Sequence, residues 1–380
     1  MTPPIWTYLE SVDAGTITAC FREWRDEQPA LGLLALVSEH EAGAVAALQQ
    51  AASQAGRPLA GAVVPGLIVG GGFRRQGVLL LALDAATPQR IVPLPRCGDT
   101  TDDAAVADLA AFVEAHAAED GSDTLLLFFD ALTPDISSFL DRLYLVVGNQ
   151  VRYAGSNVGS ETFQPVSCLF DNARFVGNAV LALLLPHHPG AVLAHRYGTT
   201  TPLSVATGTH GNRITSIDGV PAFEAYQKLV ADTHGVALTR ENFYQYAVHF
   251  PLALHLAEGE PLVRIAVAVD DDGSLYCVGE VPEAALLSIV EAPPPGAPET
   301  AQTVAAGVCA HRPAAVLAFY CAGRQLYQGE AAAAMELAEL RDALAPAPVF
   351  GALSLGEIAN HGGHGYPRFH NAALVAVPWC

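Results

Sequence analysis

Short runs of apolar residues recur along the chain and alternate with amphipathic stretches. Residues 31–37, 124–129 and 315–321 (LGLLALV, TLLLFF and AVLAFYC) have the length and composition of buried strands. A helical pattern follows each run, and a further apolar stretch follows each helix. Buried strands that alternate with amphipathic helices are typical of layered folds in which helices cover the sheets. The pattern therefore predicts an α/β protein of repeated strand-helix-strand units.

The order of strand, helix, glycine-containing turn and further strand occurs three times, which indicates an internal repeat. The recurring glycines are Gly61, Gly155 and Gly351, followed four or five residues later by Gly66, Gly159 and Gly356. Glycine between two strands permits positive φ and lets a second backbone or a ligand approach closely. We therefore expect residues 31–84 to superpose on residues 315–377, with Gly61 on Gly351.

The segment between the second and third copies has a different pattern. Apolar and polar residues alternate there, as in antiparallel strands, and one amphipathic helix is predicted at AFEAYQKLVADTH. Residues 261–282 read as a hairpin that turns at Asp272-Gly273. We expect an antiparallel β-rich middle segment and a main boundary near residue 190, which gives domains 1–190 and 191–380.

Composition narrows the class of protein. The chain has 380 residues, of which 51% are hydrophobic and 15% charged, and a formal net charge of −20. This apolar content excludes a disordered chain, and the acidic surface argues against binding to nucleic acid or to an anionic membrane. The longest clean apolar run, Val180 to Leu185, is too short to span a bilayer. The first residues do not resemble a signal peptide, and seven scattered cysteines favour reduced thiols, so we expect a cytoplasmic protein.

Several motifs together resemble the FIST proteins, which carry a FIST N domain followed by a FIST C domain. They are the glycine-rich turn after the first helix, ITSIDGVPAFEAYQKL, VPEAALLSI, FYCAGR at 319–324, GALSLGEI at 351–358 and the late Asn371. The resemblance covers about residues 30–378 and places a FIST N-like domain in 1–190 and a FIST C-like domain in 191–380. The chain departs from the family in its first turn, GAVVPG, and at Ala284, where a glycine is usual.

The resemblance implies a prokaryotic sensory domain that binds small ligands such as amino acids. One branch of standalone members is described as haem-binding nitric-oxide sensors that regulate histidine kinases, and this is the alternative function. The chain has no kinase, cyclase or receiver pattern, so a signal would have to pass through a separate partner protein. We expect no enzyme, because Ser354 in ALSLG is not followed by the helix that a nucleophile elbow requires.

Arg324, Glu357 and Asn371 are the first candidates for a ligand site. They follow successive strands of the third unit, where α/β sheets place their ligands. An arginine pairs with a carboxylate and a glutamate accepts from an ammonium group, so the three could hold an amino acid. Gly351 and Gly356 would admit the ligand, with His195 and Tyr320 as wall residues. The alternative is a structural Arg324–Glu357 ion pair.

Histidines are the second set of candidates. His361, His364 and His370 have the spacing H-x2-H-x5-H in a glycine-rich loop, which could present imidazoles to Zn or Ni. Solvated loop histidines are the alternative. A haem would need one axial imidazole and an apolar slot, and the candidates for that role are His195 and His311. The sequence does not choose between them.

Overall fold

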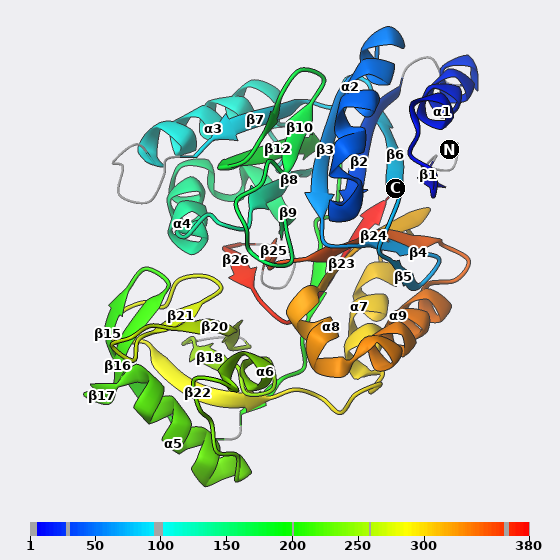
Figure 1. Ribbon diagram of the computed structural model, residues 1–380. Helices are drawn as coiled ribbons and strands as arrows, with labels where there is room; N and C mark the ends of the chain where they lie inside the picture. Colours follow the sequence, from blue (N-terminus) through cyan, green and yellow to red (C-terminus); the bar gives the residue numbers. More distant parts are fainter. Residues whose placement is uncertain are drawn as a thin grey trace.

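The computed structural model describes residues 6–27, 31–94, 102–199, 201–257, 260–360 and 365–379. These residues form a mixed α/β structure, as predicted, with three six-stranded sheets and one nine-stranded sheet. The three smaller sheets belong to three copies of one structural unit, and the larger sheet belongs to a separate β module (Figure 1).

Unit 1 consists of residues 6–84 and sets the pattern for the other two. Its elements are β1 (Trp6–Leu9), α1 (Ala14–Glu27), β2 (Leu31–Ser38), η1 (Glu39–Ala44), α2 (Val45–Gln54), β3 (Leu59–Val64), β4 (Leu67–Val69), β5 (Gly72–Arg74) and β6 (Val78–Asp84). Strands β2 and β3 are parallel, and β6 and β1 add antiparallel strands on the other side of β2. The short hairpin β4–β5 leaves this sheet, and we call it the arm of unit 1.

Units 2 and 3 repeat this order. Unit 2 contains β7 (Gln89–Pro93), α3 (Asp102–His116), β8 (Asp123–Asp130), α4 (Ile136–Val147), η2 (Gly148–Gln150), β9 (Val151–Val158), the arm β10 (Leu169–Asp171) and β11 (Phe175–Val176), and β12 (Ala179–Leu185). Unit 3 contains β13 (Val192–Ala194), α7 (Glu299–Cys309), β23 (Ala315–Cys321), α8 (Ala322–Gln328), α9 (Glu330–Leu344), β24 (Val349–Ser354), the arm β25 (Glu357–Asn360) and β26 (Pro367–His370), and β27 (Leu374–Trp379).

The arms are exchanged around the three units in a closed cycle. The arm of unit 1 joins the sheet of unit 3, where β4 pairs with β24. The arm of unit 2 joins unit 1 through the pair β10 and β3, and the arm of unit 3 joins unit 2 through β25 and β9. The strand orders are β1-β6-β2-β3-β10-β11, β7-β12-β8-β9-β25-β26 and β13-β27-β23-β24-β4-β5. The sequence predicted the repeat but not this exchange.

The repeated glycines lie at equivalent places, as expected, although inside the second parallel strand rather than in a turn. Gly61 is opposite Ala35 on the neighbouring strand, and Gly351 is opposite Ala318. A Cβ atom at Gly351 would lie 1.8 Å from the carbonyl oxygen of Ala318, and φ is 154°. The same clash exists at Gly155 of unit 2. Close backbone approach between parallel strands is therefore the reason for glycine at these positions.

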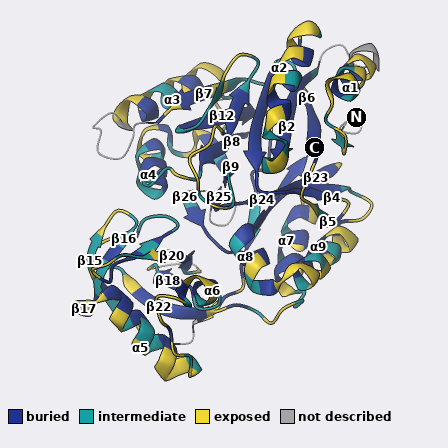
Figure 2. Cartoon of the chain, in the orientation of Figure 1, coloured by how far each residue is buried: buried dark blue, intermediate teal, exposed yellow. Residues whose placement is uncertain are grey.

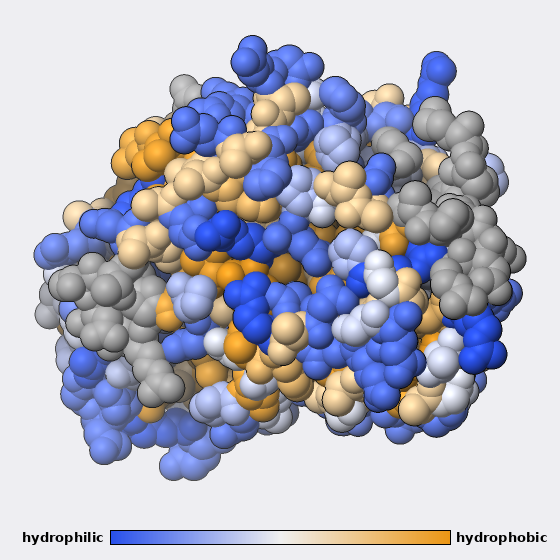
Figure 3. All heavy atoms as spheres, turned by 90° about the horizontal axis from the view of Figure 1, so that it is seen from above, coloured by the Kyte–Doolittle hydropathy of each residue, from blue (hydrophilic) through white to orange (hydrophobic). Residues whose placement is uncertain are grey.

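The main core lies between the units. Inner faces of all three sheets meet there, and Phe128 of unit 2 packs edge-on against Phe319 of unit 3. Pairs of helices cover the outer faces, with α3 and α4 on unit 2 and α7 and α9 on unit 3. Figure 2 shows the central strands of the three units buried and the outward sides of the helices exposed. In the view from above, hydrophilic residues cover most of the surface and hydrophobic residues show between them (Figure 3).

The β-rich middle segment forms the inserted module, residues 198–291, between β13 and α7 of unit 3. Its elements are β14 (Gly198–Thr199), β15 (Ser204–His210), β16 (Arg213–Ile217), β17 (Val220–Pro221), α5 (Ala222–His234), α6 (Phe243–Ala247), β18 (Leu252–His255), β19 (Leu262–Arg264), β20 (Ala266–Val269), β21 (Leu275–Cys277) and β22 (Leu286–Glu291). All of its strand pairs are antiparallel, and β20 and β21 form the hairpin predicted at Asp272-Gly273. Among the helices that the structure describes, none is long and apolar enough to cross a membrane.

Candidate functional site

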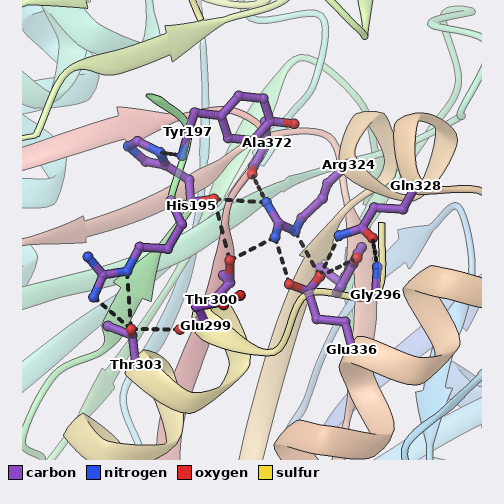
Figure 4. A network of polar contacts seen from close by, with 12 residues as sticks. His195, Tyr197, Gly296, Glu299, Thr300, Thr303, Arg324, Gln328, Glu336 and Ala372 are labelled. Carbon is purple, nitrogen blue, oxygen red and sulfur yellow. Dashed lines mark hydrogen bonds and ion pairs between the residues drawn. The ribbon is translucent and has the colours of Figure 1, made fainter. Parts of the chain in front are cut away.

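Arg324 lies in a closed polar network at the start of α8, not in a ligand cleft (Figure 4). Its Nε and Nη2 donate to the Glu336 carboxylate at 2.8 and 2.6 Å. Nη1 donates to the carbonyl oxygens of His195 and Ala372, and Nη2 also donates to Thr300 Oγ1. These bonds use all five N–H donors of the guanidinium group. Burial opposes its charge, but the bonds and charge of Glu336 outweigh burial and raise the pKa of Arg324.

Arg324 therefore has no donor left for a ligand in this arrangement, and the alternative of an ion pair with Glu357 is wrong. The partner of Arg324 is Glu336 of α9, which is fully buried. The Tyr320 hydroxyl also donates to Glu336, at 2.6 Å, so Tyr320 belongs to the same network and is not a wall of a cleft. The structural alternative holds for Arg324, with a different acidic partner.

Glu357 is buried under the strand ends, away from Arg324. Its Oε1 accepts from the Ser354 hydroxyl at 2.5 Å, and its Oε2 accepts from the Ala373 amide at 3.3 Å. Burial raises its pKa to about 8, against the opposing effect of these bonds. The carboxyl group is therefore mostly protonated at neutral pH. Ser354 is itself buried and is followed by β25 instead of a helix, which leaves no nucleophile elbow.

Asn371 is the one member of the predicted trio that reaches a cavity. Its Oδ1 accepts from the Ile265 amide at 3.3 Å, which links unit 3 to the inserted module. The cavity beside it, lined also by Cys321, Gly323 and Leu326, has a volume of only about 50 Å³. Ligand sites for small molecules usually enclose about 300–1,000 Å³. This cavity can take water or a few atoms, but not an amino acid.

The two predicted glycines do not admit a ligand. The space beside Gly351 is filled by the Ala318 carbonyl group, as described above. The ring of Phe369 covers Gly356, where a Cβ atom would lie 2.3 Å from it. These glycines let chain segments of unit 3 pack closely, and neither of them opens a cleft.

The geometry of His195 and His311 does not fit a haem ligand. His195 is buried, its Nδ1 accepts from the Tyr197 amide at 3.0 Å, and its Nε2 lies 3.1 Å from the carbonyl oxygen of Pro261. Both ring nitrogens are thus engaged by the backbone, and burial lowers the pKa of the ring. His311 is exposed on the turn after α7, so its ring is not enclosed as an axial haem ligand would be.

The predicted metal site falls mostly outside the described residues. His361 and His364 belong to the stretch 361–364, and only His370 is described. His370 is buried in β26, opposite Glu357 of β25. Within the described part of the chain, no group of three histidine, cysteine or acidic residues could hold a metal ion. The three-histidine site stays a prediction.

A cleft of about 440 Å³ lies between unit 2 and the inserted module. The first turn of α4 and the end of β26 form one side, and β19 with the segment between β21 and β22 forms the other. We call it the module cleft. Its charged lining residues are Arg264, Arg368, Asp141, Glu280 and Glu283. Its volume and mixed charge are those of a site for a small polar molecule.

Arg264 is the buried cation of the module cleft. It is 1% exposed, and its Nη1 donates to the carbonyl oxygens of Val263 and Phe369, both at 3.0 Å. Nε donates to the Glu280 carbonyl oxygen, and Nη2 donates to Ser137 Oγ at 3.3 Å. One Nη2–H has no hydrogen-bond partner among the described residues, and the side chain lines the cleft. Burial lowers the pKa of Arg264 to about 10, so the group remains charged at neutral pH.

Acidic groups stand around this cation. The Glu280 carboxylate accepts from the Ser138 amide at 2.7 Å and from the Ser138 hydroxyl. Burial raises the pKa of Glu280, and Ser138 opposes that shift. Burial also raises the pKa of Asp141, against the charge of Arg368, whereas Glu283 is exposed at the rim. The carboxylate of a zwitterionic molecule could pair with the arginines of the cleft, and its ammonium group could pair with one of these acidic side chains.

The module cleft is not evident from the pattern of residues along the chain. Its clearest signal was Arg264 itself, a single arginine within the apolar strand pattern of PLVRIAVAV. A charged residue in a buried strand needs a partner or a function. Its partners could not be read from the chain, because Phe369 and Ser137 are 105 and 127 residues away.

The repeated α/β units, with a charged cleft against an inserted β module, form a scaffold that can hold a small molecule. A family model of the FIST N domain matches residues 30–220, and one of the FIST C domain matches residues 222–360. The chain therefore belongs to the FIST family, which confirms the resemblance. FIST domains are small-ligand-sensing domains of signalling proteins. A comparison with curated proteins found no match. The two family models meet inside the inserted module, and the boundary near residue 190 stays a prediction.

Proposed function

We propose that this protein senses a small amino-acid-like molecule, binds it in the module cleft, and signals through a separate protein. The observation that carries the proposal is the buried guanidinium of Arg264, which lines a cleft of about 440 Å³ and has one N–H donor without a hydrogen-bond partner among the described residues. A ligand carboxylate would accept from this donor and from Arg368 at the rim. Its ammonium group would lie against Asp141, Glu280 or Glu283.

The output would depend on contact with another protein, such as a histidine kinase. The matched FIST models cover 30–220 and 222–360, and FIST domains are sensing domains of signalling proteins. We propose binding without catalysis and a cytoplasmic location, as the composition suggests. The haem-sensing alternative gains no support from His195, since backbone groups engage both of its ring nitrogens, or from His311, since its side chain is exposed.

A calorimetric titration of the full chain with each of the twenty amino acids tests the proposal. At least one should bind, and it should raise the melting temperature, because a ligand at 100 times its Kd stabilises the fold by about 2.7 kcal/mol. Arg264→Lys keeps the positive charge but loses the forked donors. We expect this variant to weaken binding by at least about tenfold, which is about 1.4 kcal/mol.

The matched control is Arg22→Gln on the exposed side of α1, compared with Arg368→Gln at the cleft. The first should leave the affinity unchanged and the second should lower it. If no amino acid binds, or if Arg264→Lys binds as well as the parent protein, the module cleft is not the site.

A further inference from the structure

The first turn of α4 is capped by a side chain from the other wall of the module cleft. Asp135, at the N-cap position, makes no capping hydrogen bond with its side chain. The Ser138 amide instead donates to Glu280 Oε2 at 2.7 Å, and the Ser138 hydroxyl donates to Oε1. Glu280 is 142 residues away in the chain, on the segment between β21 and β22. A carboxylate thus already sits where the dipole of α4 favours negative charge.

Arg264 places its free donor beside the same position. Its Nη2 bonds to Ser137 Oγ, the residue before Ser138, and its Nε holds the backbone carbonyl of Glu280. The donors that a ligand carboxylate would meet at the floor of the cleft are therefore Arg264 Nη2 and the amide and hydroxyl of Ser138. Two of these three are taken by Glu280.

We propose that Glu280 is a tethered competitor of the ligand: its carboxylate accepts from the amide and hydroxyl of Ser138, and a ligand carboxylate must displace it. This inference rests on the proposed function and concerns how the same site selects its ligand. Only the side chain needs to move, because Arg264 Nε and the bond from the Val281 amide to the Gly211 carbonyl fix the backbone on either side.

The displaced Glu280 carboxylate can then interact with another part of the ligand. Once released from Ser138, Glu280 faces the cleft with Asp141 and Glu283, and it can accept from an ammonium group of the ligand. A ligand that has a carboxylate but no ammonium group must break the contacts between Glu280 and Ser138, and it forms no ion pair with the released Glu280 side chain. A zwitterion breaks the same contacts and gains an ion pair. Competition by Glu280 therefore favours the binding of amino acids over that of carboxylic acids of the same size.

Acetate and glycine are suitable probes, because they differ in the ammonium group alone. Their binding is measured on the full chain from the amide NMR signal of Ser138 and by calorimetry, at constant ionic strength. Glu280→Gln keeps the shape and removes the charge of the competitor, and Glu283→Gln removes a charge from the same cleft without touching α4. We expect Glu280→Gln to bind acetate at least about tenfold more tightly and to lose about tenfold of the preference for glycine.

The control Glu283→Gln should change acetate affinity by much less, because its carboxylate occupies none of these donors. Ser138→Ala weakens the hold on Glu280 but leaves the amide in place, so it should also strengthen acetate binding if Glu280→Gln folds poorly. Unchanged acetate affinity in both folded variants, or an equal gain in Glu283→Gln, overturns the inference. Amino-acid binding by the parent protein with unchanged acetate affinity in Glu280→Gln leaves the proposed function standing. If Glu280→Gln binds acetate more tightly but the parent protein binds no amino acid, the competitor role of Glu280 stands and the proposed function is overturned. If no variant binds either probe, both are overturned.

Discussion

Equivalent residues of the three units do the same structural task with different chemistry. The last residue of the first parallel strand is Ser38, Asp130 or Cys321, and each bonds the loop before the unit's final strand. The Ser38 hydroxyl donates to the Arg75 carbonyl, Asp130 Oδ2 accepts from the Asn178 amide at 2.6 Å, and Cys321 Sγ accepts from the Ala372 amide at 3.1 Å. Cys321 is buried, and burial raises the pKa of its thiol, which favours the protonated form in the core.

Glu357 should make the stability of the protein fall as the pH rises. Burial raises its pKa from 4.5 to about 8, so the folded chain keeps the proton in a range where the unfolded chain loses it. The unfolded state is therefore favoured progressively between about pH 4.5 and pH 8, by up to about 1.4 kcal/mol per pH unit. Glu357→Gln should remove this part of the slope, as measured by urea unfolding at several pH values. Parallel curves for the two proteins would contradict the buried, protonated carboxyl group.

Arg324 should matter for stability rather than for ligand affinity. Arg324→Ala leaves the Glu336 carboxylate buried without its main partner, which should cost about 3–5 kcal/mol of unfolding free energy. The double variant Arg324→Met with Glu336→Leu removes both charges and should recover most of that loss. Thermal unfolding checks both variants, and amino-acid affinity in the folded fraction should equal that of the parent. A stable Arg324→Ala variant that no longer binds would return Arg324 to the site.

At the scale of elements, the parallel strand pair of each unit depends on a glycine without a side chain. Gly155 and Gly351 have the same φ of 154° and the same close contact with a carbonyl group of the neighbouring strand. The glycine spacing was visible in the sequence because it recurs in three copies. Its meaning was not, because a glycine in a turn and a glycine at a close backbone contact look alike along the chain.

Gly351→Ala and Gly155→Ala should each destabilise the protein by at least about 3 kcal/mol, because the new methyl group would overlap a backbone carbonyl. Gly43→Ala is the matched control. It lies in η1 with nothing within 4 Å of the new atom, and alanine should be neutral or stabilise by up to about 1 kcal/mol. Unfolding midpoints in urea compare the three variants. Equal midpoints for Gly351→Ala and Gly43→Ala would show that the strands can separate without loss.

Hydrophobic periodicity was enough to predict the strands, the repeat and the β-rich segment, because these depend on neighbouring residues. It could not predict which sheet each arm joins, since Leu67–Val69 reads as a short strand whatever its partner. The same limit applied to the ligand site. Arg324 and Glu357 were expected to meet because each follows a strand of unit 3, but Glu336 on α9 takes Arg324. Tertiary contacts decided both outcomes.

For the whole molecule, exchange of arms means that no unit completes its sheet alone. The β9 edge of unit 2 is covered by β25, and β24 of unit 3 is covered by β4. The core between the units contains Phe128 and Phe319 from different halves of the chain. The FIST N and FIST C parts are thus joined through shared sheets as well as through the polypeptide.

The fragment 1–190 should therefore fail to fold cooperatively, although it contains all of units 1 and 2. It lacks β25 and β26, and its own arm β4–β5 has no β24 to pair with. Exposed strand edges of this kind favour aggregation. Circular dichroism and urea unfolding, with the full chain as control, should show weak structure without a sharp transition. A cooperative transition in the fragment would mean that exchanged arms are dispensable.

The position of the inserted module has a practical consequence for protein engineering. Residues 195–298 connect the edge strand β13 to α7 of unit 3. This long connection does not interrupt the exchange of arms, because β13 and the exchanged hairpin β4–β5 are at opposite edges of the sheet. The connection between β1 and α1 occupies the same place in unit 1. A fluorescent reporter grafted there should leave the fold intact, with a melting temperature within a few degrees of the parent's. A ligand-dependent change in its emission would turn the chain into a biosensor without altering the module cleft.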